Sequence, residues 1–127
     1  MNKRIAYAID GPFIGGGHLH MLGLAEAARA HGYHVEIICS APGPFPEMAR
    51  HRDFNIHFLR MGKFPSAATR NSWQSKISEL KPDLLHLHGG VAGFWGRWAT
   101  KGMPLRVIYT IHGIHFIHNP SFWIRQV

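Results

Sequence analysis

The sequences KPDLLHLHGG at 81–90 and LRVIYTIHG at 105–113 decide the fold class of this chain. Each contains a short apolar run that is bounded by Pro, Asp or Gly and leads to a histidine followed by glycine. Such runs are typical of parallel strands that are buried on both faces of a sheet. Because open parallel sheets bind ligands at the carboxyl ends of their strands, we expect His88 and His112 to stand at one edge of the sheet.

Length and composition favour a single domain that covers residues 1–127. The hydrophobic fraction of 46% is that of a globular protein, and the absence of repeats or low-complexity segments excludes a disordered chain. No run approaches the ~18 apolar residues of a membrane span, and Ile5 to Ile9 is too short for a signal-peptide core. A single cysteine, Cys39, cannot form an intramolecular disulfide. We therefore expect a cytoplasmic protein.

The chain is strongly basic, with 14 Lys and Arg against 7 Asp and Glu and a net charge of +7. Much of the excess lies between Arg50 and Lys81. Such a surface attracts phosphates, anionic lipid or nucleic acid, and it also serves simply to keep a protein soluble. Because no nucleic-acid-binding motif is present, we expect no nucleic-acid partner and favour peripheral contact with an anionic membrane or an acidic acceptor.

Short apolar runs alternate with helical patterns along the chain, which predicts an α/β fold with helices on both faces of a parallel sheet. Right-handed crossovers give a Rossmann-like sheet of about five strands in the order 3-2-1-4-5. The predicted strands run from Arg4 to Ile9, Val35 to Cys39, Ile56 to Leu59, Leu84 to Leu87 and Val107 to Ile111.

Helical spacing of apolar residues fills the intervals between these strands. His18 to Ala30 is predicted as the first helix, whereas Ser40 to Pro46 is predicted as a loop because of its prolines and glycine. Trp73, Ile77 and Leu80 lie on a later helix that ends before Pro82. In the last crossover helix we expect the aromatic residues to pack against the sheet, with two glycines allowing close approach: Phe94, Trp95, Trp98, Gly93 and Gly96.

The loop after the first strand, DGPFIGGGHLH at 10–20, is the first chemical candidate. Gly15, Gly16 and Gly17 directly precede a helix, where backbone amides can approach a phosphate. The loop is not a dinucleotide fingerprint, because the second strand ends at Cys39 without an acidic residue. A flexible turn is the other interpretation.

Eleven histidines raise the question of a metal site. Pairs two residues apart, such as His18 with His20 and His86 with His88, have spacings seen in metal sites. We expect His86 to lie deeper in the sheet, where a hydrogen-bonded core histidine is the commoner outcome. Surface or core roles are therefore favoured over a metal site.

Three segments in order resemble the N-terminal domain of a family 4 retaining glycosyltransferase with the GT-B fold. They are GGGHLHMLGLAEAARAHGYHVEII at 15–38, KPDLLHLHGGVAGFWGRWA at 81–99 and RVIYTIHGIHF at 106–116. The first is similar to the family's glycine loop and first helix. The second is similar to its PD-x-x-H-x-H strand and helix, and the third to its T-x-H-G strand end.

The resemblance implies transfer of a hexose from a nucleotide-sugar to a glycan or lipid-linked acceptor, with retained configuration and without metal or another cofactor. Gly16 and Gly17 would place backbone amides near the donor diphosphate or the transferred sugar. His112 would be the catalytic residue, contacting the sugar as positive charge develops on it. His88 and Gly113 would shape the acceptor side. Relatives of this style build surface polysaccharides or lipid-linked glycans.

The resemblance also implies a second domain, which carries an E-x7-E motif and binds the nucleotide. No such segment follows here, and PSFWIRQV at 120–127 looks like the opening of a helix. We expect the acceptor-side domain, incomplete at its C-terminus and inactive without the donor domain. Two other interpretations stay open: a catalytically silent fragment or partner-binding module with the same fold, and a small metal-dependent hydrolase that uses the paired histidines.

Overall fold

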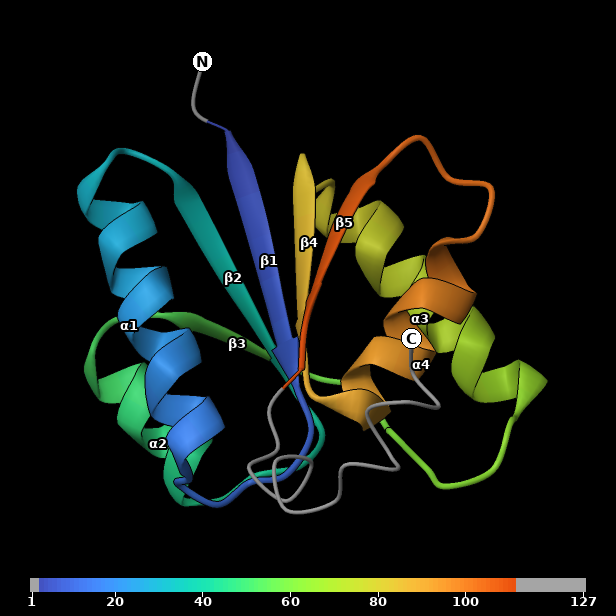
Figure 1. Cartoon of the computed structure of the whole chain (residues 1–127), viewed down its shortest axis with the longest axis horizontal. Helices are drawn as coiled ribbons and strands as arrows, with labels where there is room; N and C mark the ends of the chain where they lie inside the picture. Colours follow the sequence, from blue (N-terminus) through green and yellow to red (C-terminus); the bar gives the residue numbers. More distant parts are fainter. Residues whose placement is uncertain (1–2, 112–127) are drawn as a thin grey trace, which may run out of the picture.

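The computed structural model of the chain describes residues 3–111, and within them the predicted Rossmann-like sheet is confirmed (Figure 1). Five parallel strands lie in the order β3-β2-β1-β4-β5. Helices α1 and α2 cover one face, and α3 and α4 cover the other (Figure 1). The elements are β1 (Arg4–Ile9), α1 (Gly16–Ala30), β2 (His34–Cys39), α2 (Pro44–His51), β3 (Asn55–Phe58), α3 (Ala67–Leu80), β4 (Leu84–His88), α4 (Gly90–Thr100) and β5 (Arg106–Thr110).

The central strand β1 shows how the two cores form. Alternate side chains of a strand point to opposite faces, so Tyr7 and Ile9 join the cluster under α1 and α2. Ala6 and Ala8 join the cluster under α3 and α4. Both faces are thus buried, as the unbroken apolar run of β1 predicts. None of the helices within residues 3–111 is long and apolar enough to cross a membrane.

One predicted loop is wrong, because α2 begins at Pro44, inside the segment from Ser40 to Pro46. A proline is tolerated in the first turn of a helix, where its missing N–H would have no partner within the helix. Phe45 and Pro46 then become buried rather than exposed. The prolines that suggested a loop therefore mark the start of a helix.

Close packing of α4 against the sheet is confirmed at both predicted glycines. A Cβ atom on Gly96 would lie 2.2 Å from Cδ2 of Leu87 in β4. A Cβ atom on Gly93 would lie 2.5 Å from Cε1 of Tyr109 in β5. Neither distance is possible, so a larger residue at either position would force the facing side chain or the helix to move.

The aromatic residues of α4 divide between core and surface. Trp95 is buried against the sheet, as predicted. Phe94 is 42% exposed, so its predicted packing on the sheet is wrong. Neighbouring helix residues point about 100° apart. Because Trp95 occupies the buried face, Phe94 is turned away from the sheet, and Trp98 is half-buried.

A buried carboxylate ties the edge strand β3 to β2. Glu36 accepts hydrogen bonds from Nδ2 of Asn55 at 2.9 Å and from Nε2 of His57 at 2.8 Å. Nε2 of His34 lies 2.9 Å from Oε2 of Glu36, the oxygen that also accepts from Asn55. Burial alone would raise the pKa of Glu36, but the hydrogen bonds from Asn55 and His57 and the charge of both histidines outweigh it and hold the pKa below 4.5.

We expect Gly96→Ala to lower the free energy of unfolding by about 1–3 kcal/mol, because the added methyl group overlaps the buried Leu87. Gly23→Ala is the matched control, since Gly23 lies within α1 and a Cβ atom there meets nothing within 4 Å. It should raise the free energy of unfolding by about 0.5–1 kcal/mol. Urea denaturation measures both. Equal effects of the two substitutions would contradict the close contact of α4.

We expect Glu36 to make the free energy of unfolding depend on acid pH. Because its pKa is lowered in the folded chain, its contribution is complete above pH 4.5 and is lost as the pH falls through the folded pKa. The stability difference between the parental chain and Glu36→Gln should therefore shrink as the pH falls below 4.5, in urea titrations at a series of pH values. Glu79→Gln, at an exposed site, should follow the parental curve. A constant difference for Glu36→Gln would contradict the prediction.

Candidate functional site

A cavity of about 270 Å³ lies at the carboxyl ends of β1 and β4. The loop after β1 and the start of α4 meet at this edge of the sheet (Figure 1). Two residues from the sequence-based prediction, Gly17 and His88, line the same cavity. The full lining is Ile9, Asp10, Gly17, His18, His88, Gly89, Gly90 and Val91.

Two helices begin at this cavity. Gly15 is the N-cap of α1, and Gly89 is the N-cap of α4. In the part of the chain that the structure describes, no side chain caps either helix, and neither first turn contains Asp or Glu. The amides of both first turns are therefore available to an anion, which the two helix dipoles also attract.

The predicted glycine loop holds its shape through His18. Nε2 of His18 lies 3.1 Å from the carbonyl oxygen of Asp10 and 2.9 Å from that of Gly11. Both partners are acceptors, so this nitrogen carries the proton and donates to them. The amide of Gly11 donates in turn to Oγ of Ser40 at 2.9 Å. His18 thus orders the loop, which is a structural role.

The loop after β1 is also fixed to the start of α2. The amide of Phe45 donates to the carbonyl oxygen of Pro12 at 2.8 Å, and the Phe45 ring meets the His18 ring edge-on at 4.8 Å between centroids. A Cβ atom on Gly43 would lie 2.5 Å from Cβ of Pro12. This contact was not among the sequence-based predictions. The predicted strand order, 3-2-1-4-5, places the carboxyl ends of β1 and β2 side by side. That order could have predicted a contact between the loops that follow these two strands.

Gly89 joins the ends of β4 and β5. Its φ of +85° lies in the left-handed region that favours glycine, and its amide donates to the carbonyl oxygen of Thr110 at 3.0 Å. Thr110 is also the register partner of His88. The HG sequence after β4 is therefore a sharp turn that brings the start of α4 to the cavity.

The two histidines of β4 have the opposite depths to those predicted. His88 is 0% exposed, whereas His86 is only partly buried. The rings of His86 and His88 stack with centroids 4.1 Å apart, on the face of the sheet that also carries Tyr7. Nε2 of His86 lies 2.6 Å from Oγ1 of Thr110. His88 lies deeper than His86 because α1 and its preceding loop cover the carboxyl end of β4. There the ring centroids of His20, in α1, and His88 are 6.2 Å apart.

Of the predicted substrate-binding residues, the structure brings Gly15, Gly16, Gly17 and His88 to one edge of the sheet. His112 and Gly113 lie outside the described residues. Within residues 3–111, no group of three or more His, Cys, Asp or Glu side chains is placed to hold a metal ion.

The family model described as Glycosyltransferase Family 4 matches residues 14–126. The match begins in the loop after β1 and includes both helix starts at the cavity. This chain belongs to Glycosyltransferase Family 4. Among curated proteins, no sequence matches it significantly.

Solved structures similar to this family 4 chain include several glycosyltransferases. MurG from Acinetobacter baumannii has a TM-score of 0.70 at 14% identity, over 91% of this chain and 38% of MurG. A glycosyltransferase from Rickettsia africae has a TM-score of 0.75 at 15% identity, over 89% and 30% of the two chains. Anabaena Alr3699/HepE, solved with UDP and glucose, has a TM-score of 0.75 at 15% identity, over 98% and 34%.

These similarities show the fold of the family 4 domain, and the chain spans only about a third of the length of each structure named. A UDP-N-acetylglucosamine 2-epimerase is also similar, with a TM-score of 0.67 at 13% identity over 99% of this chain and 39% of the epimerase. The same fold therefore serves more than one reaction on sugars. The reaction of this chain has to be argued from its site and its family.

We expect His18→Ala to loosen the loop after β1 in this family 4 domain. Loss of the bonds to Asp10 and Gly11 should speed amide hydrogen exchange at Gly11 and Phe45 by about five- to tenfold, the effect of one lost hydrogen bond. His31→Ala is the control, since His31 also contacts a carbonyl oxygen, that of Ala27, at the other end of α1. Unchanged exchange in His18→Ala would contradict the role of His18.

Proposed function

We propose that this chain is the acceptor-side part of a retaining glycosyltransferase that moves a hexose from a nucleotide-sugar to a glycan or lipid-linked acceptor. The observation that carries the proposal is the meeting of two uncapped helix N-termini and His88 at one cavity. Membership of Glycosyltransferase Family 4 supports sugar transfer as the reaction at this site. Surface polysaccharide or lipid-linked glycan synthesis is the process proposed for it.

The chemistry of sugar transfer suits this arrangement. As the bond to the nucleotide breaks, negative charge grows on the diphosphate and positive charge grows on the sugar ring. The amides of the first turns of α1 and α4 are fixed dipoles that stabilise the negative charge without rearrangement. Gly15, Gly16 and Gly17 carry no side chains of their own that would keep a phosphate or sugar hydroxyl from this backbone.

His112 is the proposed catalytic residue, as its place in the family motif implies. It follows β5 by two residues, and β5 ends at Thr110, opposite His88. In the proposed reaction His112 contacts the transferred sugar as positive charge develops on that sugar. His88 and Gly113 shape the acceptor side, with His88 lying at the floor of the cavity because it is fully buried.

The size of the cavity supports a division of the substrate between two domains. Pockets that enclose a drug-sized ligand measure about 300–1,000 Å³. A cavity of about 270 Å³ can hold a phosphate or one sugar ring, but it is too small for a whole nucleotide-sugar. We propose that the nucleoside is bound by a second domain outside these 127 residues, as in the two-domain GT-B architecture that the sequence resembles.

We expect the 127-residue chain to bind UDP-glucose with a Kd weaker than about 1 mM, about −4 kcal/mol, because the nucleoside lacks its partner surface. Titration calorimetry with UDP-glucose, the ligand solved with Alr3699/HepE, measures this. A Kd in the micromolar range would contradict the proposed division of the donor site.

We expect His112→Ala to lower kcat by about 10²–10³-fold in a chain that also carries the second domain, because the substitution removes a group that stabilises transition-state charge. The free energy of unfolding should change little. His115→Ala is the matched control, since it removes an imidazole three residues further along the chain. Transfer of labelled sugar to the acceptor measures the rate. Equal activity of His112→Ala and His115→Ala would exclude His112 from catalysis.

A further inference from the structure

The side chain of His86, in the middle of β4, reaches along the sheet toward the cavity rather than straight across it. Its register partner on β5 is Ile108, yet its Nε2 lies 2.6 Å from Oγ1 of Thr110, two residues nearer the carboxyl end of β5. Residues two apart on one strand share a face, so His86 and Thr110 meet on the face of the sheet that carries Tyr7. At this distance the two atoms share a hydrogen bond.

Thr110 is held by β4 and its turn at two points. His86 binds its hydroxyl, and the amide of Gly89 donates to its carbonyl oxygen at 3.0 Å. Both contacts come from the four-residue segment 86–89, which also contains His88 at the floor of the cavity. One short segment therefore fixes the end of β5 and forms part of the site.

The imidazole of His86 is itself held by aromatic packing. Its ring stacks on that of His88, with centroids 4.1 Å apart and planes 31° apart. The Tyr7 ring lies 5.5 Å from the His86 ring and 6.0 Å from the His88 ring. Tyr7 is buried and belongs to the central strand β1, so the stack is anchored in the core. His86 thus offers Thr110 a hydrogen-bond partner at a fixed place.

The hydroxyl of Thr110 needs an explanation that strand formation does not supply. Valine has the same shape as threonine, is also branched at Cβ and is favoured in strands. Threonine differs from it by the hydroxyl group, and in β5 that hydroxyl is the group that meets His86. The side chain at position 110 is therefore suited to this contact in a way that an apolar strand residue is not.

We propose that His86 is a positioning residue for sugar transfer, which acts through Thr110 on the point where the chain leaves β5. Thr110 ends β5, and His112, the proposed catalytic residue, follows with only Ile111 between them. The inference rests on the proposed function, because it assigns His86 a part in the same reaction. The H-x-H-G segment of β4 and the T-x-H-G segment of β5 then act as one hydrogen-bonded unit.

The rate of a group transfer depends steeply on the position of the groups that assist it. A displacement of about 1 Å can lower a rate by about 10²-fold. On the opposite face of the sheet, α4 holds the neighbouring residue of β5, because Tyr109 packs against Gly93 and lies 4.7 Å from the guanidinium of Arg97. His86 supplies the anchor on the other face, so the end of β5 is held from both sides.

The first test is spectroscopic and needs no sugar transfer. In the 127-residue chain, nitrogen NMR of the His86 ring reports the hydrogen bond at Nε2. Thr110→Val removes the hydroxyl and should change the Nε2 chemical shift, whereas Thr110→Ser keeps the hydroxyl and should retain the parental shift. Amide exchange at Gly89 should become about three- to tenfold faster in Thr110→Val, the effect of one lost hydrogen bond at its partner.

The second test measures turnover in a chain that also carries the second domain, as release of nucleoside diphosphate from a panel of UDP-, GDP- and ADP-hexoses. Thr110→Val and His86→Phe should each lower kcat about three- to tenfold with the donor KM unchanged, because each removes the bond but keeps the shape of its side chain. The double substitution should lower kcat no further, since both changes remove the same bond. Thr110→Ser should retain the parental kcat.

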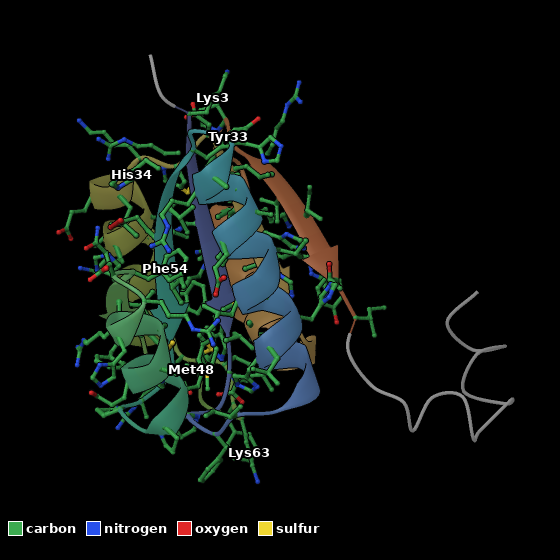
Figure 2. All side chains as sticks on the ribbon, turned by 90° about the vertical axis from the view of Figure 1, so that its left-hand side faces the viewer. Lys3, Tyr33, His34, Met48, Phe54 and Lys63 are labelled. Carbon is green, nitrogen blue, oxygen red and sulfur yellow. The ribbon has the colours of Figure 1, made fainter. Side chains whose placement is uncertain are left out.

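Thr100 is the matched control for a lost threonine hydroxyl. Its Oγ1 donates to the carbonyl oxygen of Gly96 at 2.7 Å, and the residue is buried. Thr100 ends α4, which runs from the cavity toward the end of the molecule that Lys3 and Tyr33 mark in Figure 2. Thr100→Val should therefore lower the temperature of thermal unfolding but leave kcat unchanged.

The outcomes separate this inference from the proposed function. An unchanged His86 ring shift in Thr110→Val would overturn the inference whatever the turnover. A changed shift with unchanged kcat, beside loss of activity in His112→Ala, would also overturn it and leave the proposed function standing. A kcat as low in Thr100→Val as in Thr110→Val would reduce the effect to lost stability and exclude positioning. Turnover that is absent with the whole panel, or unaffected by His112→Ala, would contradict the proposed catalytic site and this inference together.

Discussion

Gly96 lets α4 lie directly on Leu87, and much of the molecule depends on that contact. Because α4 packs so closely on β4, its first turn lies at the cavity, immediately after the Gly89 turn. The same position brings Trp95 under the loop between β3 and α3, where the indole holds the carbonyl of Gly62. One glycine in a helix therefore sets both the anion-attracting end of α4 and the anchoring of the loop before α3.

The site is built from backbone more than from side chains. Its polar groups include the amides at two helix starts, and Asp10, His18 and His88 line the same cavity. His18 closes the turn after β1, and Gly89 closes the turn after β4 by bonding to Thr110. This suits a reaction in which charge develops on a diphosphate and a sugar ring, because fixed dipoles stabilise such charge without reorganising.

The sequence was sufficient for the strands, the sheet order and the position of Gly17 at the cavity. Apolar runs with fixed connections leave few topologies, and glycine at a helix start has few other uses. The sequence was insufficient where burial depends on contacts between segments that are distant in the chain. Pro44 looked like part of a loop because the burial of Phe45 against the loop after β1 is a tertiary contact. His88 proved deeper than His86 because α1 covers one end of β4.

The hydrogen-bonded Glu36 has a consequence for the chain while it folds. β3 is an edge strand of only four residues, and the carboxylate that joins it to β2 is flanked by polar Asn55 and His57. Long, flat, apolar edges recruit strands from other molecules, whereas short edges with inward charges do not. The β3 edge of the sheet is therefore a poor template for strands of other molecules, which opposes aggregation in crowded solution, including when the protein is newly synthesised.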